Sequence, residues 1–135
     1  MPSVEDTVNA LLASLNVEIR FSQQTLADLT GYNKEQQETI LALILARAKN
    51  GPLIRPNGIG EPLHGELHGF TKLKPKHLGL RVIYRPIPKT KIIMEIIAIG
   101  PRDHDQVYAI AAKRLTGFRR EMSERNQTGS THNNI

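Results

Sequence analysis

Residues 67–99 read LHGFTKLKPKHLGLRVIYRPIPKTKIIMEIIAI, and this stretch decides the fold. Three of its runs are rich in β-branched or alternating apolar residues and predict strands: Leu67–Lys74, Leu80–Arg85 and Ile92–Ile99. Turn-forming residues separate the runs, at 75–79 and at 86–90, so consecutive strands are expected to pair as hairpins. The last run is almost continuously apolar, which is typical of a central strand buried on both faces.

The chain before this stretch predicts a strand and helices. Val17–Phe21 alternates in polarity as a short strand does. Ser22 is placed to cap a helix over residues 23–30, and Asn33 with Gln36 to cap a second one that ends at Gly51. Residues 1–16 predict a helical extension whose capping box is Ser3 with Asp6.

After the stretch, Asp103 with Gln106 again fits a capping box, and a last helix is expected from there. We therefore predict an α+β protein in which an N-terminal strand and a helix pair pack on an antiparallel four-stranded sheet, followed by a C-terminal helix. The expected organisation is a helical extension (1–16), one domain (17–121) and a polar, disordered tail (122–135).

Composition limits the chemistry. Among 135 residues there is no Cys, which excludes a disulfide scaffold, a Cys-ligated metal site and a thiol nucleophile. No apolar run reaches the ~18–20 residues of a membrane helix, and the N-terminus lacks a signal pattern, so we expect a cytoplasmic protein. The net charge of +5 is uneven, because residues 72–135 carry 13 Lys and Arg against 5 Asp and Glu. That asymmetry indicates a polyanionic partner, although a merely solvated basic surface is the alternative.

The basic residues are expected to gather on the predicted hairpin. Strand alternation places Lys72 and Lys74 on one face, and Arg81 and Arg85 share a face of the next strand. Lys76 lies in the turn between them, and the hairpin brings these cations together. Arg102 and Tyr108 follow the end of the central strand and complete a candidate anion site, which consists of Lys72, Lys74, Lys76, Arg81, Arg102 and Tyr108.

Other site patterns are weak. Gly58-Ile-Gly60 has no strand before it and no Lys-Ser or Lys-Thr after it, so it is not a phosphate-binding loop. His64 and His68 have the spacing of metal ligands on a helix, but intervening glycines disfavour that helix. We expect neither a metal nor a cofactor.

Four segments in order resemble the RelE/ParE superfamily of toxins from bacterial toxin–antitoxin systems: Leu67–Lys74, Gly79–Tyr84, Ile97–Asp103 and Val107–Arg114. The resemblance is greatest to the RelE branch of ribosome-dependent mRNA endonucleases. It implies catalytic roles for Lys72, Lys74, Arg81, Arg102 and Tyr108. It also implies RNA contacts for Lys76, Arg85, Phe70 and His104. Pro75 departs from the family pattern, and His104 stands where another basic residue is expected.

The resemblance implies cleavage of mRNA by its own 2′-hydroxyl and inhibition of translation. The implied partners are a cognate antitoxin, the ribosome with mRNA in its A site, and RNA; the toxin–antitoxin complex would bind operator DNA through the antitoxin. A non-enzymatic, ParE-like inhibitor of DNA gyrase is the main alternative. A basic nucleic-acid-binding module without catalysis is a third, but no recognition-helix pattern favours it.

Overall fold

The computed structural model describes residues 2–75 and 77–133, with side chains as far as Asn126. In chain order the elements are α1 (Val4–Ala10), β1 (Val17–Phe21), α2 (Gln23–Thr30), α3 (Lys34–Asn50), a 3₁₀ turn (Gly65–Leu67), β2 (Thr71–Leu73), β3 (Leu80–Pro88), β4 (Ile92–Pro101), a second 3₁₀ turn (Asp103–Asp105) and α4 (Gln106–Asn133). The predicted α+β class is confirmed, with a four-stranded, mostly antiparallel sheet and a C-terminal helix.

The strand order in the sheet is β1-β4-β3-β2. β2 with β3 and β3 with β4 form the two expected antiparallel pairs. β1, however, runs parallel to β4, with Val17 opposite Ile92, so the expectation of a wholly antiparallel sheet is wrong at this pair. Parallel neighbours need a long crossover, and here α2, α3 and two further strands separate β1 from β4 in the chain.

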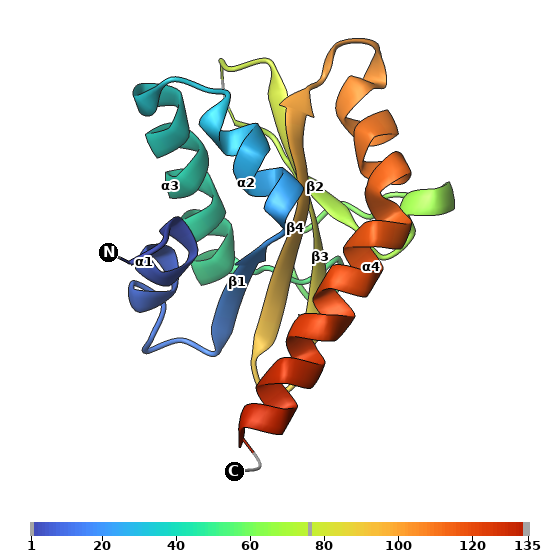
Figure 1. The fold of residues 1–135 in the computed structure, drawn as a ribbon. Coiled ribbons are helices and arrows are strands. Elements are labelled where there is room, and N and C mark those ends of the chain that lie inside the picture. The colour runs from blue at the N-terminus through green and yellow to red at the C-terminus, as the bar shows by residue number, and fades with distance from the viewer. Residues whose placement is uncertain (1, 76, 134–135) are drawn as a thin grey trace.

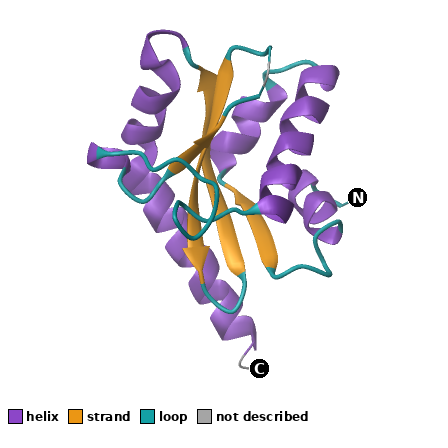
Figure 2. Cartoon of the chain, turned by 180° about the vertical axis from the view of Figure 1, so that it is seen from behind, coloured by secondary structure: helices purple, strands orange, loops and turns teal. Residues whose placement is uncertain are grey.

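Helices cover both faces of the sheet (Figure 1). α2 and α3 lie on one side and α4 crosses the other, as the view from behind also shows (Figure 2). The apolar residues accordingly form two clusters. One includes Ile19, Leu29 and Ile44 against the first face, and the other includes Ile83 and Phe118 under α4.

The N-terminal helix packs on the domain. Its predicted capping box is confirmed, because the Ser3 hydroxyl accepts from the Asp6 amide and the Asp6 carboxylate accepts from the Ser3 amide. Val8 and Leu12 are buried in the same cluster as β1. The predicted caps Ser22 and Asn33 are also confirmed at α2 and α3.

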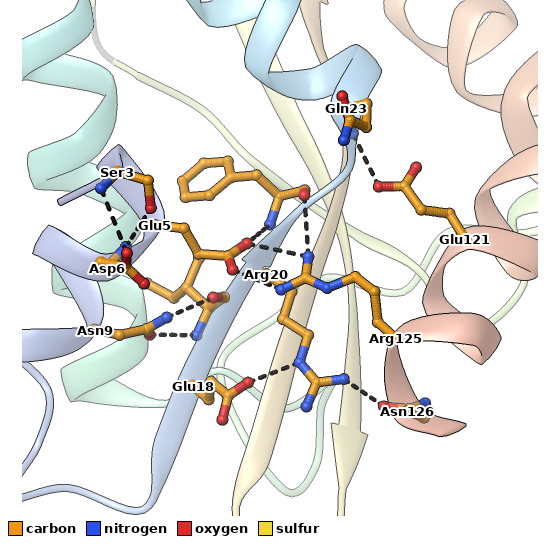
Figure 3. Close-up of polar contacts among 12 residues, drawn as sticks. Ser3, Glu5, Asp6, Asn9, Glu18, Arg20, Gln23, Glu121, Arg125 and Asn126 are labelled. Carbon is orange, nitrogen blue, oxygen red and sulfur yellow. Dashed lines mark hydrogen bonds and ion pairs between the residues drawn. The ribbon is translucent and has the colours of Figure 1, made fainter. Parts of the chain in front are cut away.

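The expectation of a disordered tail from residue 122 is wrong, because α4 continues through Asn133. Met122 is buried, with 1% of its surface exposed. Arg125 donates to the Glu5 carboxylate and to the Phe21 carbonyl, while Asn126 accepts from Arg20 (Figure 3). These partners all lie within the first 21 residues of the chain. The polar composition of the tail therefore does not reveal that contacts with the N-terminal segment stabilise its helix.

Several predicted boundaries also need correction. The strand expected over Leu80–Arg85 continues to Pro88, because residues 86–88 remain paired with β4 where a turn was expected. The strand expected over Leu67–Lys74 is limited to Thr71–Leu73, because residues 65–67 form a 3₁₀ turn and Gly69 has φ 92°. Asp103 is not the cap of α4. It begins a 3₁₀ turn in which His104 has the left-handed φ of 54°, and α4 starts only at Gln106.

Candidate active site

The expected cations meet where three segments of the sheet end. A hollow of about 410 Å³ is lined by Lys74, Pro75, His77, Gly79, Arg81 and Arg102. Lys74 follows β2, Arg81 lies near the start of β3, and Arg102 follows β4. Strand register produces this convergence, because Arg81 lies opposite Gly100 on β4. The Arg102 amide also donates to the Gly79 carbonyl at 3.1 Å, which ties the β2–β3 turn to the end of β4.

Lys72 and Tyr108 form a pair beside this hollow. Lys72 lies opposite Ile83, whose side chain packs in the cluster under α4. Its ammonium group therefore reaches the α4 side of the sheet, where it lies 5.8 Å from the centre of the Tyr108 ring. A cation at this distance from a ring face is attracted to it. Tyr108 itself is half-buried against the same cluster.

Glu61 is an acidic residue of the site that the sequence reasoning missed. Its carboxylate lies 3.4 Å from the Lys74 ammonium and 3.8 Å from that of Lys72. The charge of Lys72 and the hydrogen bond and charge of Lys74 hold the pKa of the Glu61 carboxyl below its usual value. Glu61 is therefore an anion at neutral pH and a shared counter-ion of both lysines.

A second hollow of about 380 Å³ adjoins the first. Four of its lining residues belong to α3, namely Leu43, Ala46, Arg47 and Asn50. The others are Ile59 and Glu61 of the loop before β2, and Lys72, Leu73 and Lys74 in and just after β2. Lys74 lines both hollows. The two lysines expected on one strand face thus border adjacent cavities, with Glu61 between their ammonium groups.

Phe70 and Arg85, two of the expected RNA contacts, have structural roles instead. Phe70 is 1% exposed, so the expectation that its ring stacks on RNA bases is wrong. The Arg85 guanidinium lies 5.5 Å from the Phe70 ring and 5.4 Å from the Phe118 ring. It also donates two hydrogen bonds to Glu95, a carboxylate that is 2% exposed. Arg85 is therefore committed to neutralising a buried charge.

The two remaining expected RNA contacts, His104 and Lys76, are not among the described residues that line the hollow. His104 is exposed on the turn before α4 and is not among the residues that line it. Lys76 lies outside the described residues. His77, by contrast, lines the hollow and was missed. The signal that could have found it is its position in the predicted turn between the two basic strands.

The described part of the chain contains neither a metal-binding cluster nor a helix that could cross a membrane. Within 2–75 and 77–126, where side chains are described, no group of three or more His, Asp and Glu side chains could hold a metal ion. In the same part of the chain, no helix combines the length and the apolar character required to cross a bilayer.

Solved structures of bacterial RelE toxins have a similar fold. The fold is similar to that of a double arginine-to-alanine variant of Escherichia coli toxin RelE in the free state. The two share 22% identity over 72% of this chain and 95% of that one, with a TM-score of 0.56. It is also similar to a YoeB/ParE toxin from Agrobacterium tumefaciens, with 22% identity, coverage of 62% and 97%, and a TM-score of 0.50.

The same E. coli RelE variant bound to a peptide of the antitoxin RelB is a third similar structure. It has 22% identity, coverage of 69% of this chain and 90% of that one, and a TM-score of 0.50. No protein-family model and no curated protein matches the sequence. The chain thus has the RelE-like fold that its motifs predict.

Proposed function

We propose that this chain is the toxin of a type II toxin–antitoxin system and acts as a ribosome-dependent mRNA endonuclease of the RelE branch. One observation carries the proposal: Lys74, Arg81 and Arg102, from three segments, line a single hollow in a RelE-like fold. Such a site suits a phosphodiester, whose negative charge increases in the transition state of cleavage.

The proposed chemistry uses the substrate's own nucleophile. The ribose 2′-oxygen attacks phosphorus and loses its proton, the bond from phosphorus to the 5′-oxygen breaks, and that oxygen gains a proton. The products are a 2′,3′-cyclic phosphate and a 5′-hydroxyl end. Arg81 and Arg102 clamp the phosphate oxygens, because planar guanidinium groups can bind two oxygens at once.

Lys72, Lys74 and Tyr108 complete the proposed site. Lys74 adds a third positive charge at the hollow, and Lys72 lies against the Tyr108 ring. A phenol and an ammonium group can each exchange a proton with the substrate. The lining also favours a metal-independent reaction, because its described charged residues are cations and would repel a divalent ion.

The proposed partners follow from the same function. The toxin would act in the cytoplasm on the ribosome with mRNA in its A site, where the ribosome positions the RNA. A cognate antitoxin would bind it, as an antitoxin peptide binds the similar RelE variant. That complex would contact operator DNA through the antitoxin.

Inducible expression with transcriptome-wide mapping of 5′ ends tests the proposal. We expect growth arrest and new 5′-hydroxyl ends inside translated codons, and both should disappear when initiation on the mRNA is blocked. Arg81→Ala and Arg102→Ala should each relieve the arrest. Arg119→Ala is the matched control, since Arg119 is an exposed arginine of α4 and does not line the hollow.

Two outcomes contradict the proposal. Intact mRNA together with inhibited DNA supercoiling would identify a gyrase inhibitor of the ParE type. Full toxicity in both arginine variants would show that the hollow is not the site.

A further inference from the structure

Among the described residues, Lys74 is the one proton-transfer candidate of the family resemblance that lines the phosphate hollow. Lys72 and Tyr108 are not among the residues lining it, and they face one another beside it. Cleavage needs one proton removed from the 2′-oxygen and one delivered to the 5′-oxygen, both within reach of the clamped phosphate. Lys74 supplies one such group inside the hollow, so the second transfer calls for another group within reach of the phosphate.

His77 is the residue of the hollow with suitable chemistry. Imidazole is the side chain that both takes up and releases protons near neutral pH. Among the described residues, the charged groups that line the hollow with His77 are Lys74 of the β2 segment, Arg81 of β3 and Arg102 beyond β4. Arginine does not give up its proton in proteins, which leaves His77 and Lys74 for proton transfer at the clamped phosphate.

The backbone at His77 gives an independent reason to assign it a role. His77 has φ 66°, in the left-handed region that few residues other than glycine adopt, although histidine, asparagine and aspartate do so more often than the rest. The turn that holds it is fixed at its far end by the bond from the Arg102 amide to the Gly79 carbonyl. Conformations of this kind concentrate at functional sites. The turn thus holds an exposed histidine at the hollow in a conformation that glycine or asparagine would adopt at less cost.

We propose that His77 is a catalytic residue that transfers one of the two protons at the scissile phosphate. The inference rests on the proposed endonuclease function. As a base, His77 would take the 2′-hydroxyl proton while the 2′-oxygen–phosphorus bond forms. As an acid, it would give a proton to the 5′-oxygen as the phosphorus–oxygen bond breaks. The Lys72–Tyr108 pair or Lys74 would carry the other transfer.

The test is single-turnover cleavage of a short mRNA on bacterial 70S ribosomes by the purified full chain, across about pH 5.5–8.5. His77→Asn is the main variant, because asparagine tolerates the left-handed conformation but does not titrate. His77→Gly is the second variant, since glycine has no side chain to strain the turn. His68→Asn is the control, because His68 is exposed and lines neither hollow.

We expect His77→Asn and His77→Gly to reduce the cleavage rate about 100-fold or more, while circular dichroism and melting temperature stay as in the wild type. The rate of the wild type should change with pH across the neutral range, and this change should be absent in both variants. A merely structural role would instead lower the rate equally at every pH.

The inference is overturned if the wild type cleaves and either folded variant keeps its rate and pH dependence. A wild type that cleaves nothing on the ribosome contradicts the proposed function itself, and with it the role of His77. His68→Asn should match the wild type in both measurements, which assigns any loss to the position of His77 rather than to a lost histidine.

Discussion

Glu61 places a negative charge among the cations of the site, where it lies between the ammonium groups of Lys72 and Lys74. The pKa of Glu61 is lowered, which means that the fold stabilises its carboxylate form. This stabilisation is fully present at any pH above the ordinary pKa of a glutamate. The pairing is lost only as pH falls through that lowered value. Glu61 therefore stays ionised across the neutral range, and a rate change there reports another group.

Glu61→Gln should lower the cleavage rate constant about tenfold, because both lysines lose the charge that holds them, and small misplacements of positioning groups are costly. The apparent substrate affinity should not weaken, because the substitution removes a negative charge. Kinetics on programmed ribosomes separate the two quantities. Glu66→Gln, an exposed neighbour on the same loop, is the control and should match the wild type. A rate unchanged by Glu61→Gln would contradict the positioning role.

Arg85 illustrates a cation whose role is stability. It is bonded to Glu95, which is 2% exposed on the central strand β4. Arg85→Met should lower the free energy of unfolding by about 3–5 kcal/mol, because it leaves a buried carboxylate unpaired. Removing both charges with Arg85→Met and Glu95→Met should recover most of that loss. Urea unfolding measures both, and a single variant as stable as the wild type would contradict this account.

At the scale of elements, side chains close the free edge of β1. Asn9 of α1 accepts from the Ile19 amide at 2.7 Å and donates to its carbonyl at 2.8 Å (Figure 3). Two residues further along, Glu5 accepts from the Phe21 amide, and Arg125 of α4 donates to the Phe21 carbonyl. An open strand edge is prone to pairing with other chains. α1 and the end of α4 together prevent this.

The Glu5–Arg125 ion pair joins α1 to α4. Burial opposes the charge of Arg125, but the hydrogen bond and charge of Glu5, together with the charges of Glu121 and Glu18, outweigh it and raise the pKa of the guanidinium. Glu5→Ala should lower the free energy of unfolding by about 1–3 kcal/mol, because the Phe21 amide loses its acceptor. Glu38→Ala, at an exposed position of α3, should change it by less than about 0.5 kcal/mol. Denaturant titration compares the two variants, and equal effects would contradict a stabilising role for the contacts of Glu5.

Local signals explain why several elements could be predicted. Ser3, Ser22 and Asn33 bond amides within three residues, so their capping patterns are complete in the sequence. The apolar run of β4 likewise carries its own signal. The parallel pairing of β1 and the packing of Arg125 could not be predicted, because their partners lie 75 or more residues away.

The same distinction applies to the site. Alternation and strand order suffice to bring Lys74, Arg81 and Arg102 together. They do not show that Arg85 is bound to Glu95 and covered by the ring of Phe118. The ring belongs to α4, and its position over Arg85 is set by the packing of that helix on the sheet. Glu61 was hidden for a related reason, since it lies in a Pro- and Gly-rich loop whose path across the edge of β2 is set by tertiary contacts such as the bond from Thr71 to the Glu61 carbonyl.

At the scale of the molecule, charge is divided between the two halves of the chain. Residues 1–71 contain 5 Lys and Arg against 8 Asp and Glu, while the rest is strongly basic. Part of the basic excess is neutralised internally, as Arg85, Arg114 and Arg125 pair with Glu95, Asp28 and Glu5. The cations left to contact a phosphate backbone include Arg81 and Arg102 of the hollow, so RNA affinity should depend on them more than on net charge.

Salt dependence tests this directly. Each phosphate contact contributes about 0.7 to the slope of log affinity against log salt for single-stranded RNA. Arg81→Ala and Arg102→Ala should each reduce the slope by about that amount, because each removes one contact. Lys34→Ala removes the same charge at the start of α3, away from the hollow, and should leave the slope unchanged. Fluorescence anisotropy with a short labelled RNA at several salt concentrations measures all four proteins. If Lys34→Ala lowers the slope as much as the arginine variants do, RNA responds to overall charge and the hollow does not bind a phosphate.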